Sequence, residues 1–172
     1  MHHAQAEAWL GHEDATCREG RLERLNWLAG LMPIGEYLTF PGGWMAKHLF
    51  EEARYCLVYG QFLAAIVLGM AYVEHTLAAL FYGAGRSELE RANISVLLRE
   101  AVKHGWLSEI EFKNVDHARV LRNPVAHFRQ PLHEDTVEYR SVTLNEPPYS
   151  LLEEDARHVM QAVFRVLARQ TV

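Results

Sequence analysis

The sequence is poor in cysteine and has no excess of basic residues, and both features limit what the protein can be. Two of its 172 residues are cysteines, Cys17 and Cys56, which lie far apart without a CxxC pattern. This spacing argues against a disulfide framework or a zinc site, and it suits a reducing, cytoplasmic environment. The 17 Lys and Arg are outnumbered by 22 Asp and Glu. Because non-specific binding to nucleic acid depends on basic side chains that neutralise phosphates, a nucleic-acid role would require a local basic patch.

Common catalytic and cofactor motifs are also missing. The sequence contains no P-loop, no GxGxxG, no nucleophile elbow and no HExxH, although it has ten histidines. We therefore expect neither a bound metal nor a cofactor. The N-terminus lacks the basic start and the apolar run of a secretory signal, so we expect the protein to stay in the cytoplasm.

One long apolar stretch, Gln61–Tyr82, has the length of a membrane span. Glu74 and His75 interrupt it, and a carboxylate in the hydrocarbon core costs about 2.5 kcal/mol or more. The overall composition, 49% hydrophobic and 23% charged, is that of an ordinary soluble domain. We therefore expect a central helix that neighbouring helices bury on most sides, and no membrane partner.

Apolar residues recur at helical spacing along most of the chain. Asn93 is suited to cap the start of one helix and Gly105 to end it, and Ser108 with Glu111 forms a capping box that opens the next. We expect helices over Glu19–Met32, from Trp44 toward Gly60, and over Gln61–Tyr82, Asn93–Gly105 and Ser108–Arg122.

The C-terminal part combines a helix with an irregular stretch. A second capping box, Ser150 with Glu153, is expected to open the last helix, which continues to about Arg169. The stretch before it holds three of the six prolines and the segment TVEYRSVTL, which we expect to form a short hairpin or an extended arm. The whole pattern predicts an all-α helical bundle with a long loop before the C-terminal helix.

Arg122 lies at the end of a predicted helix and on its apolar face. Advancing by about 100° per residue places Arg122 in one sector with Val115 and Ala118, which points it toward the bundle interior or a groove. A guanidinium there requires an anionic or carbonyl partner. One candidate is Glu74 on the apolar helix. Either that helix turns one polar position to solvent, or Glu74 pairs with Arg122 or Arg119.

Arg122 and a histidine flank an Asn-Pro pair in the segment LRNPVAHFRQP. On an unbroken helix, His127 would lie about 140° around the axis from Arg122, too far to share a site. Pro124 predicts a break at Asn123, and a new turn capped by Asn123 would place His127 beside Arg122. The simpler interpretation is a helix that ends at a proline, with an arginine favoured there by the helix dipole.

The segment LRNPVAH resembles the signature of the HEPN superfamily (higher eukaryotes and prokaryotes nucleotide-binding domains). In that signature an Arg, often followed by Asn, Asp or His, precedes a His by four to six intervening residues, and Arg122, Asn123 and His127 match it. The helices in LLREAVKHGWLSEIEF and in EEARYCLVYGQFLAAIVLGMAYVEHTLAALF are similar to those of these domains. The resemblance implies a HEPN-type bundle over residues 44–172. Residues 1–43 lie outside the resemblance, and we expect them to form an N-terminal helical appendage and connection.

Catalytic members of this superfamily are metal-independent endoribonucleases that act as dimers with two facing motifs. The resemblance implies that His127 is the general acid or base, that Arg122 stabilises charge on the transition state, and that Asn123 orients the imidazole or bonds a phosphate oxygen. Because the 2′-hydroxyl of RNA is the nucleophile, the products would carry a 2′,3′-cyclic phosphate and a 5′-hydroxyl. The implied partners are RNA, a second copy of the chain, and an antitoxin or regulatory protein.

Four further residues are candidates for substrate binding. Arg119 lies on the motif helix, and Arg129 stands where some toxin members of the superfamily carry a tyrosine. Tyr139 and Arg140, in the late loop, could stack a base and hold a phosphate. Two other functions stay open. The chain could be a non-catalytic helical module that binds RNA, a nucleotide or a protein partner, or the Arg122 motif could simply close the bundle.

Overall fold

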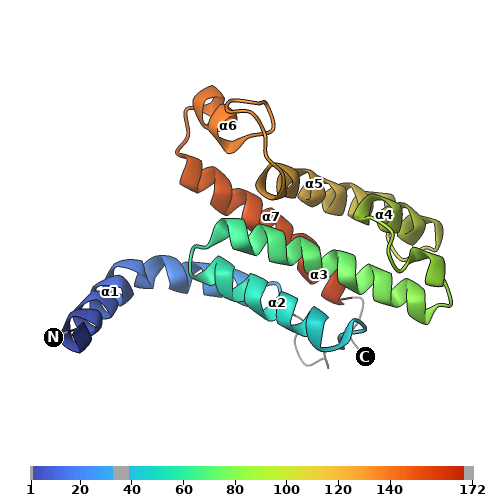
Figure 1. The fold of residues 1–172 in the computed structure, drawn as a ribbon, viewed down its shortest axis with the longest axis horizontal. Helices are drawn as coiled ribbons and strands as arrows, with labels where there is room; N and C mark the ends of the chain where they lie inside the picture. The colour runs from blue at the N-terminus through green and yellow to red at the C-terminus, as the bar shows by residue number, and fades with distance from the viewer. Residues whose placement is uncertain (1, 33–38, 169–172) are drawn as a thin grey trace.

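Helices make up most of the structure, a computed structural model that describes residues 2–32 and 39–168. Those residues contain no strand, and the predicted all-α helical bundle is confirmed (Figure 1). The elements are α1 (His2–Ala29), α2 (Gly43–Val58), α3 (Phe62–Gly83), the 3₁₀ helix η1 (Ser87–Leu89), α4 (Ile94–Lys103), α5 (Glu109–Ala126), α6 (Val137–Leu144) and α7 (Pro148–Ala168). Part of the predicted connection before α2 and the expected last residue of α7, Arg169, lie outside the described residues.

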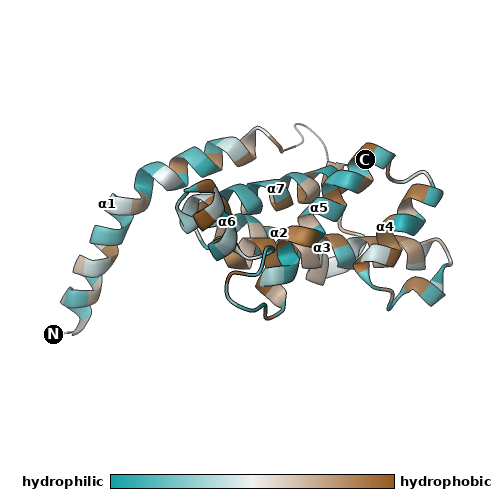
Figure 2. Cartoon of the chain, turned by 90° about the horizontal axis from the view of Figure 1, so that it is seen from above, coloured by the Kyte–Doolittle hydropathy of each residue, from teal (hydrophilic) through white to brown (hydrophobic). Residues whose placement is uncertain are grey.

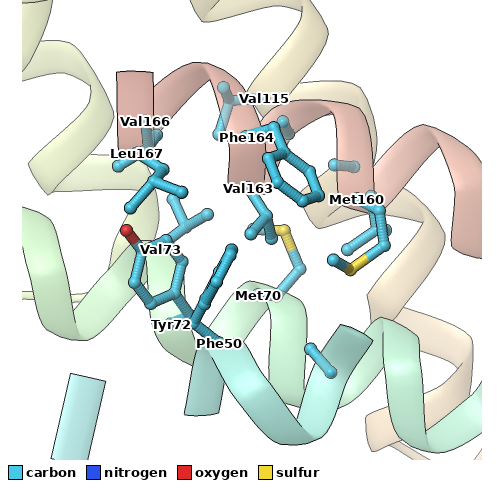
Figure 3. Close-up of a cluster of buried hydrophobic side chains, with 14 of the residues drawn as sticks. Phe50, Met70, Tyr72, Val73, Val115, Met160, Val163, Phe164, Val166 and Leu167 are labelled. Atoms are coloured by element: carbon cyan, nitrogen blue, oxygen red, sulfur yellow. The ribbon is translucent and has the colours of Figure 1, made fainter. Parts of the chain in front are cut away.

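The apolar helix α3 is the centre of the bundle, as its composition predicts. It packs against α2, α5 and α7, and Figure 3 shows side chains of these helices meeting in one buried cluster. By length and composition α3 would also suffice to cross a membrane, a test that the core helix of a soluble protein passes equally. The cluster in Figure 3 includes Phe50, Met70, Tyr72, Val73, Val115, Met160, Val163, Phe164, Val166 and Leu167.

Local capping defines α4 and α5 as the sequence predicts. The Asn93 side chain accepts a hydrogen bond from the Val96 amide at 3.1 Å. Ser108 and Glu111 form the expected capping box at the start of α5. Gly105 follows α4 with φ +70°, a left-handed conformation that glycine adopts without a steric cost. These caps fix where α4 ends and where α4 and α5 begin, and α5 packs against α3, α4 and α7.

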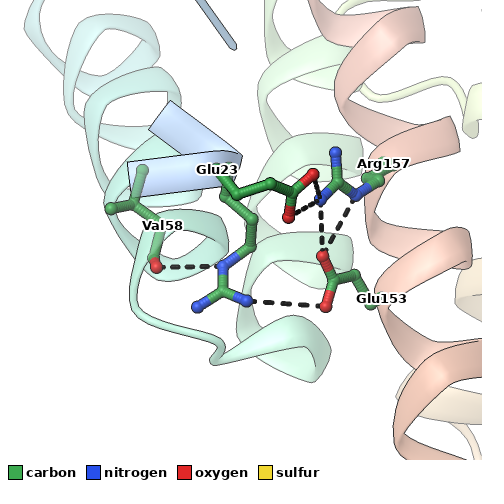
Figure 4. A network of polar contacts seen from close by, with 5 residues as sticks. Glu23, Val58, Glu153 and Arg157 are labelled. Carbon is green, nitrogen blue, oxygen red and sulfur yellow. Dashed lines mark hydrogen bonds and ion pairs between the residues drawn. The ribbon is translucent and has the colours of Figure 1, made fainter. Parts of the chain in front are cut away.

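Helix α1 is much longer than predicted, because it begins at His2 and not at Glu19. Its first half is exposed and projects away from the bundle (Figures 1 and 2). Its last turns dock through the polar network in Figure 4. Arg24 donates to the Val58 carbonyl at 3.0 Å, and Arg157 bonds Glu23 at 2.8 Å and Glu153 at 2.6 Å. The early turns were missed because their few apolar residues form no continuous stripe.

Two expectations near the C-terminus are wrong. The segment expected as a hairpin or extended arm forms the helix α6, because the Thr136 hydroxyl caps its start and Asn145 ends it in a left-handed conformation. Helix α7 begins at Pro148, two residues before the predicted cap at Ser150. Proline is favoured at the first helical position, where no backbone N–H is needed.

Candidate functional site

The break expected at Asn123 does not occur. Helix α5 continues through Pro124 to Ala126, and the His127 amide still donates to the Asn123 carbonyl at 3.0 Å. The proline is tolerated because it removes only the hydrogen bond to the Val120 carbonyl, in the last turn of the helix. Without a break, the positions of Arg122 and His127 stay about 140° apart around the α5 axis. The proline therefore does not bring the two side chains together as predicted.

Arg122 is held against the central helix. Its Nη2 lies 3.5 Å from Oε2 of Glu74, and the two side chains are 20% and 35% exposed. Of the alternatives left open by the sequence, Glu74 thus pairs with Arg122, while Arg119 bonds Asp116 at 2.6 Å within α5. The ion pair joins α3 to the end of the motif helix and fixes the guanidinium at a half-buried position.

His127 stands at the exposed end of α5, where the backbone turns to an extended conformation. Its ring has neither a hydrogen-bond nor an ion-pair partner within the part of the chain that the structure describes. The next residue, Phe128, is 86% exposed, and Arg129 Nε lies 3.8 Å from the Asp135 carboxylate. The half-buried Asn123 side chain likewise has no hydrogen-bond partner among the described residues. His127 is thus a free imidazole open to solvent.

Tyr139 and Arg140, which the sequence predicts to bind RNA together, lie in different environments. Tyr139 is exposed on α6, whereas the Arg140 guanidinium bonds both oxygens of Asp155 on α7, at 2.8 and 2.9 Å. Asp155 is 7% exposed, and its carboxylate raises the pKa of Arg140 above the ordinary value. Arg140 therefore fastens α6 to α7, and this arrangement does not fit its expected role as a phosphate ligand.

A groove of about 820 Å³ lies between α5, α6 and α7, and neither Arg122 nor His127 lines it. We call it the acidic groove, because five carboxylates and a single guanidinium lie on its walls. Its lining consists of Leu63, His117, Val120, Leu121, Pro124, Val125, Glu134, Asp135, Thr136, Val137, Glu138, Arg140, Pro148, Leu152, Glu154, Asp155 and His158. In the sequence, the acidic segment HEDTVE is the one signal that indicates this groove.

Two histidines are among the residues that line this groove. The rings of His117 and His158 meet edge to face, with 4.6 Å between their centres. His158 Nε2 is 3.1 Å from the Asn114 carbonyl. Burial lowers the pKa of His158, against the opposing effect of that backbone bond. Within the described ranges, no group of three or more His, Cys, Asp or Glu is placed to hold a metal ion.

Comparisons with protein families, with characterised proteins and with solved structures find no match to this chain. The likeness to the HEPN superfamily consequently rests on the LRNPVAH segment and the order of the helices. What the structure adds is the environment of each motif residue.

Proposed function

We propose that the protein is a metal-independent endoribonuclease of HEPN type that leaves 2′,3′-cyclic phosphate and 5′-hydroxyl ends. The observation that carries this proposal is the contrast between Arg122 and His127. Glu74 anchors the guanidinium, while the imidazole is exposed and without a partner at the end of the same helix. An anchored cation and a free imidazole are the two groups that cleavage by the RNA's own 2′-hydroxyl requires.

The chemistry needs two proton transfers. A base removes the proton of the 2′-hydroxyl, whose oxygen attacks the adjacent phosphorus, and an acid protonates the departing 5′-oxygen. His127 in its neutral form can serve as the base and in its charged form as the acid. The Arg122 guanidinium would stabilise the negative charge that accumulates on the phosphate oxygens.

One chain supplies a single His127, and its Arg122 lies on another side of α5. We therefore propose that two copies form the site, with one His127 as base and the other as acid. A mixed dimer of wild-type and His127→Ala chains tests this arrangement. A shared site predicts activity near that of the His127→Ala homodimer, whereas half of the wild-type activity would mean that each copy works alone.

A second function, a non-catalytic helical module in the cytoplasm that binds RNA, a nucleotide or a protein partner, is favoured by a different observation. Each arginine near the motif is already paired: Arg119 with Asp116, Arg122 with Glu74, and Arg129 with Asp135. An RNA phosphate would have to compete with these carboxylates. One measurement distinguishes the two functions. A nuclease produces new RNA ends, whereas a binding module binds RNA without producing them.

The matched control for the catalytic variants is His12→Ala. His12 lies in the exposed half of α1, and its ring has no contact with the described residues. We expect His127→Ala and Arg122→Ala to lower cleavage by about 100-fold or more, the usual contribution of a general acid-base group or of a charge-stabilising donor. His12→Ala should cleave like wild type. A loss in all three variants would mean that the losses do not report on the motif.

A further inference from the structure

The acidic groove is lined by apolar and by charged side chains. We call the apolar lining the floor, which includes Val120, Leu121 and Val125 of the motif helix with Leu152 of α7 and Leu63 of α3, and we call the charged lining the rim. The groove's volume of about 820 Å³ lies within the usual range for ligand sites, about 300–1,000 Å³. Apolar side chains alone would bind any apolar group. The charge of the rim therefore determines which ligands the groove prefers.

Three carboxylates on the rim take part in no hydrogen bond or close ion pair. Asp155 is bound by Arg140, and Asp135 lies within 4 Å of Arg129 and His133. Glu134, Glu138 and Glu154, in contrast, have no hydrogen-bond partner and no cation within 4 Å among the residues that the structure describes, although the charge of Glu154 also acts on Arg140. Negative charge left uncompensated around apolar surface favours a ligand that carries cations beside apolar groups.

The walls of the groove are fixed before any ligand arrives. The Arg140–Asp155 fork ties α6 to α7. The Thr136 hydroxyl accepts from the Tyr139 amide and donates to the His133 carbonyl, which fixes the start of α6. A preformed site avoids part of the entropy cost of ordering its own side chains on binding.

Two possible occupants are excluded by charge. RNA would bring phosphates against the unpaired carboxylates. Helix α1 of a second copy projects from the bundle and is available, but it carries five acidic and three basic residues, a net charge of −2. The groove and α1 would therefore repel each other, which leaves a partner of opposite charge.

We propose that the acidic groove docks a cationic amphipathic helix of a partner protein. Its leucine-like side chains pack on the floor around Val120 and Leu152, and its Lys or Arg side chains bind Glu134, Glu138 and Glu154. The docking site does not depend on the nuclease proposal, because Arg122 and His127 lie outside the groove. Each proposal can fail without the other.

The first test measures binding of a synthetic helix by fluorescence anisotropy. The probe is a labelled peptide of about 14 residues, roughly four helical turns, with leucine on one face and lysine on the other. We expect saturable binding that weakens as salt is added, and little binding of the matched leucine–glutamate peptide. No saturable binding, or equal binding of the two peptides, would overturn the proposal.

Two pairs of variants locate the site. Replacing Glu134, Glu138 and Glu154 together by Gln should weaken binding by about tenfold. The same three replacements at Glu13, Glu52 and Glu90, which are exposed and unpaired in the described chain, change the net charge equally and should have little effect. Equal losses from both triple variants would mean non-specific attraction to an acidic protein and would refute the groove.

A single substitution tests the floor without relying on the triple variant. Val120 is partly exposed on α5 and lines the groove, whereas Ile110 is an exposed apolar residue near the start of the same helix and outside it. Val120→Lys should abolish saturable binding, because it places a charged side chain where the peptide leucines would pack, and Ile110→Lys should not. Unchanged binding in folded Val120→Lys would contradict the proposal.

Discussion

At Gly69 the central helix lies close against α7. A methyl group added there would lie 2.8 Å from Cγ1 of Val159 and 3.2 Å from Cγ2 of Val163, both on α7. The two valines are fully buried, and β-branched side chains on a helix have one strongly preferred rotamer. Gly69→Ala must therefore push α3 and α7 apart or force a valine out of its rotamer.

The cost follows from two opposing effects. Overpacking a close-packed core costs about 1–3 kcal/mol, and alanine is better than glycine inside a helix by about 1 kcal/mol. The matched control is Gly83→Ala at the end of the same helix, where an added methyl would meet nothing within 4 Å. We expect Gly83→Ala to be neutral or slightly stabilising. Gly69→Ala should therefore be less stable than Gly83→Ala by about 1–3 kcal/mol.

Urea unfolding followed by circular dichroism and by tryptophan fluorescence measures both variants. For a chain of this size, a change of 1 kcal/mol corresponds to about 2–4 °C in Tm. Adding Val159→Ala to Gly69→Ala should cost less than the two single changes together, because the new methyl then occupies space that the valine left. Equal stabilities of Gly69→Ala and Gly83→Ala would refute the packing described for α3 and α7.

Three further predictions concern charged groups. Asp155→Asn should remove the charge-assisted fork to Arg140, lower the unfolding free energy by about 1–3 kcal/mol and raise amide exchange in α6; native-like exchange would contradict this. Because burial lowers the pKa of His158 in the folded state, stability should fall as pH drops from about 7 through the ordinary histidine value of about 6.5. Urea midpoints at high and low pH should therefore differ less in His158→Gln, and equal pH dependence would refute the assignment. Glu74→Ala leaves Arg122 unpaired, so it should reduce Tm slightly and RNA cleavage together; full stability and activity would defeat that role.

Local rules predicted those parts of the fold that local interactions determine. Asn93 and the Ser108–Glu111 box form where expected, because a cap needs only residues within one turn. The ion pair of Glu74 with Arg122 was also within reach, because helical periodicity turns both positions inward. The caps, and the inward direction of Glu74 and of Arg122, each depend on spacing within a single helix, which can be read directly from the sequence.

The errors arose where distant contacts or chain-end effects decide the structure. Pro124 does not end α5 at Asn123. It removes a single hydrogen bond, in the last turn, and the helix continues to Ala126. The segment TVEYRSVTL was expected to be extended, yet the Thr136 cap and the Arg140–Asp155 fork hold it as a helix. The acidic groove is assembled from four helices, α3, α5, α6 and α7, and the α5–α6 segment, so no single stretch of sequence contains it.

The central claim is that Arg122 and His127 cleave RNA, and the measurement that tests it most directly is made on a mixed RNA pool in EDTA. Wild type, Arg122→Ala, His127→Ala and the His12→Ala control are compared after circular dichroism shows that all four fold. The account predicts 2′,3′-cyclic phosphate ends with wild type and His12→Ala, and none above background with the two motif variants. Cyclic-phosphate ends formed at the wild-type rate by folded His127→Ala, or no cleavage by wild type on any RNA in the pool, would contradict it.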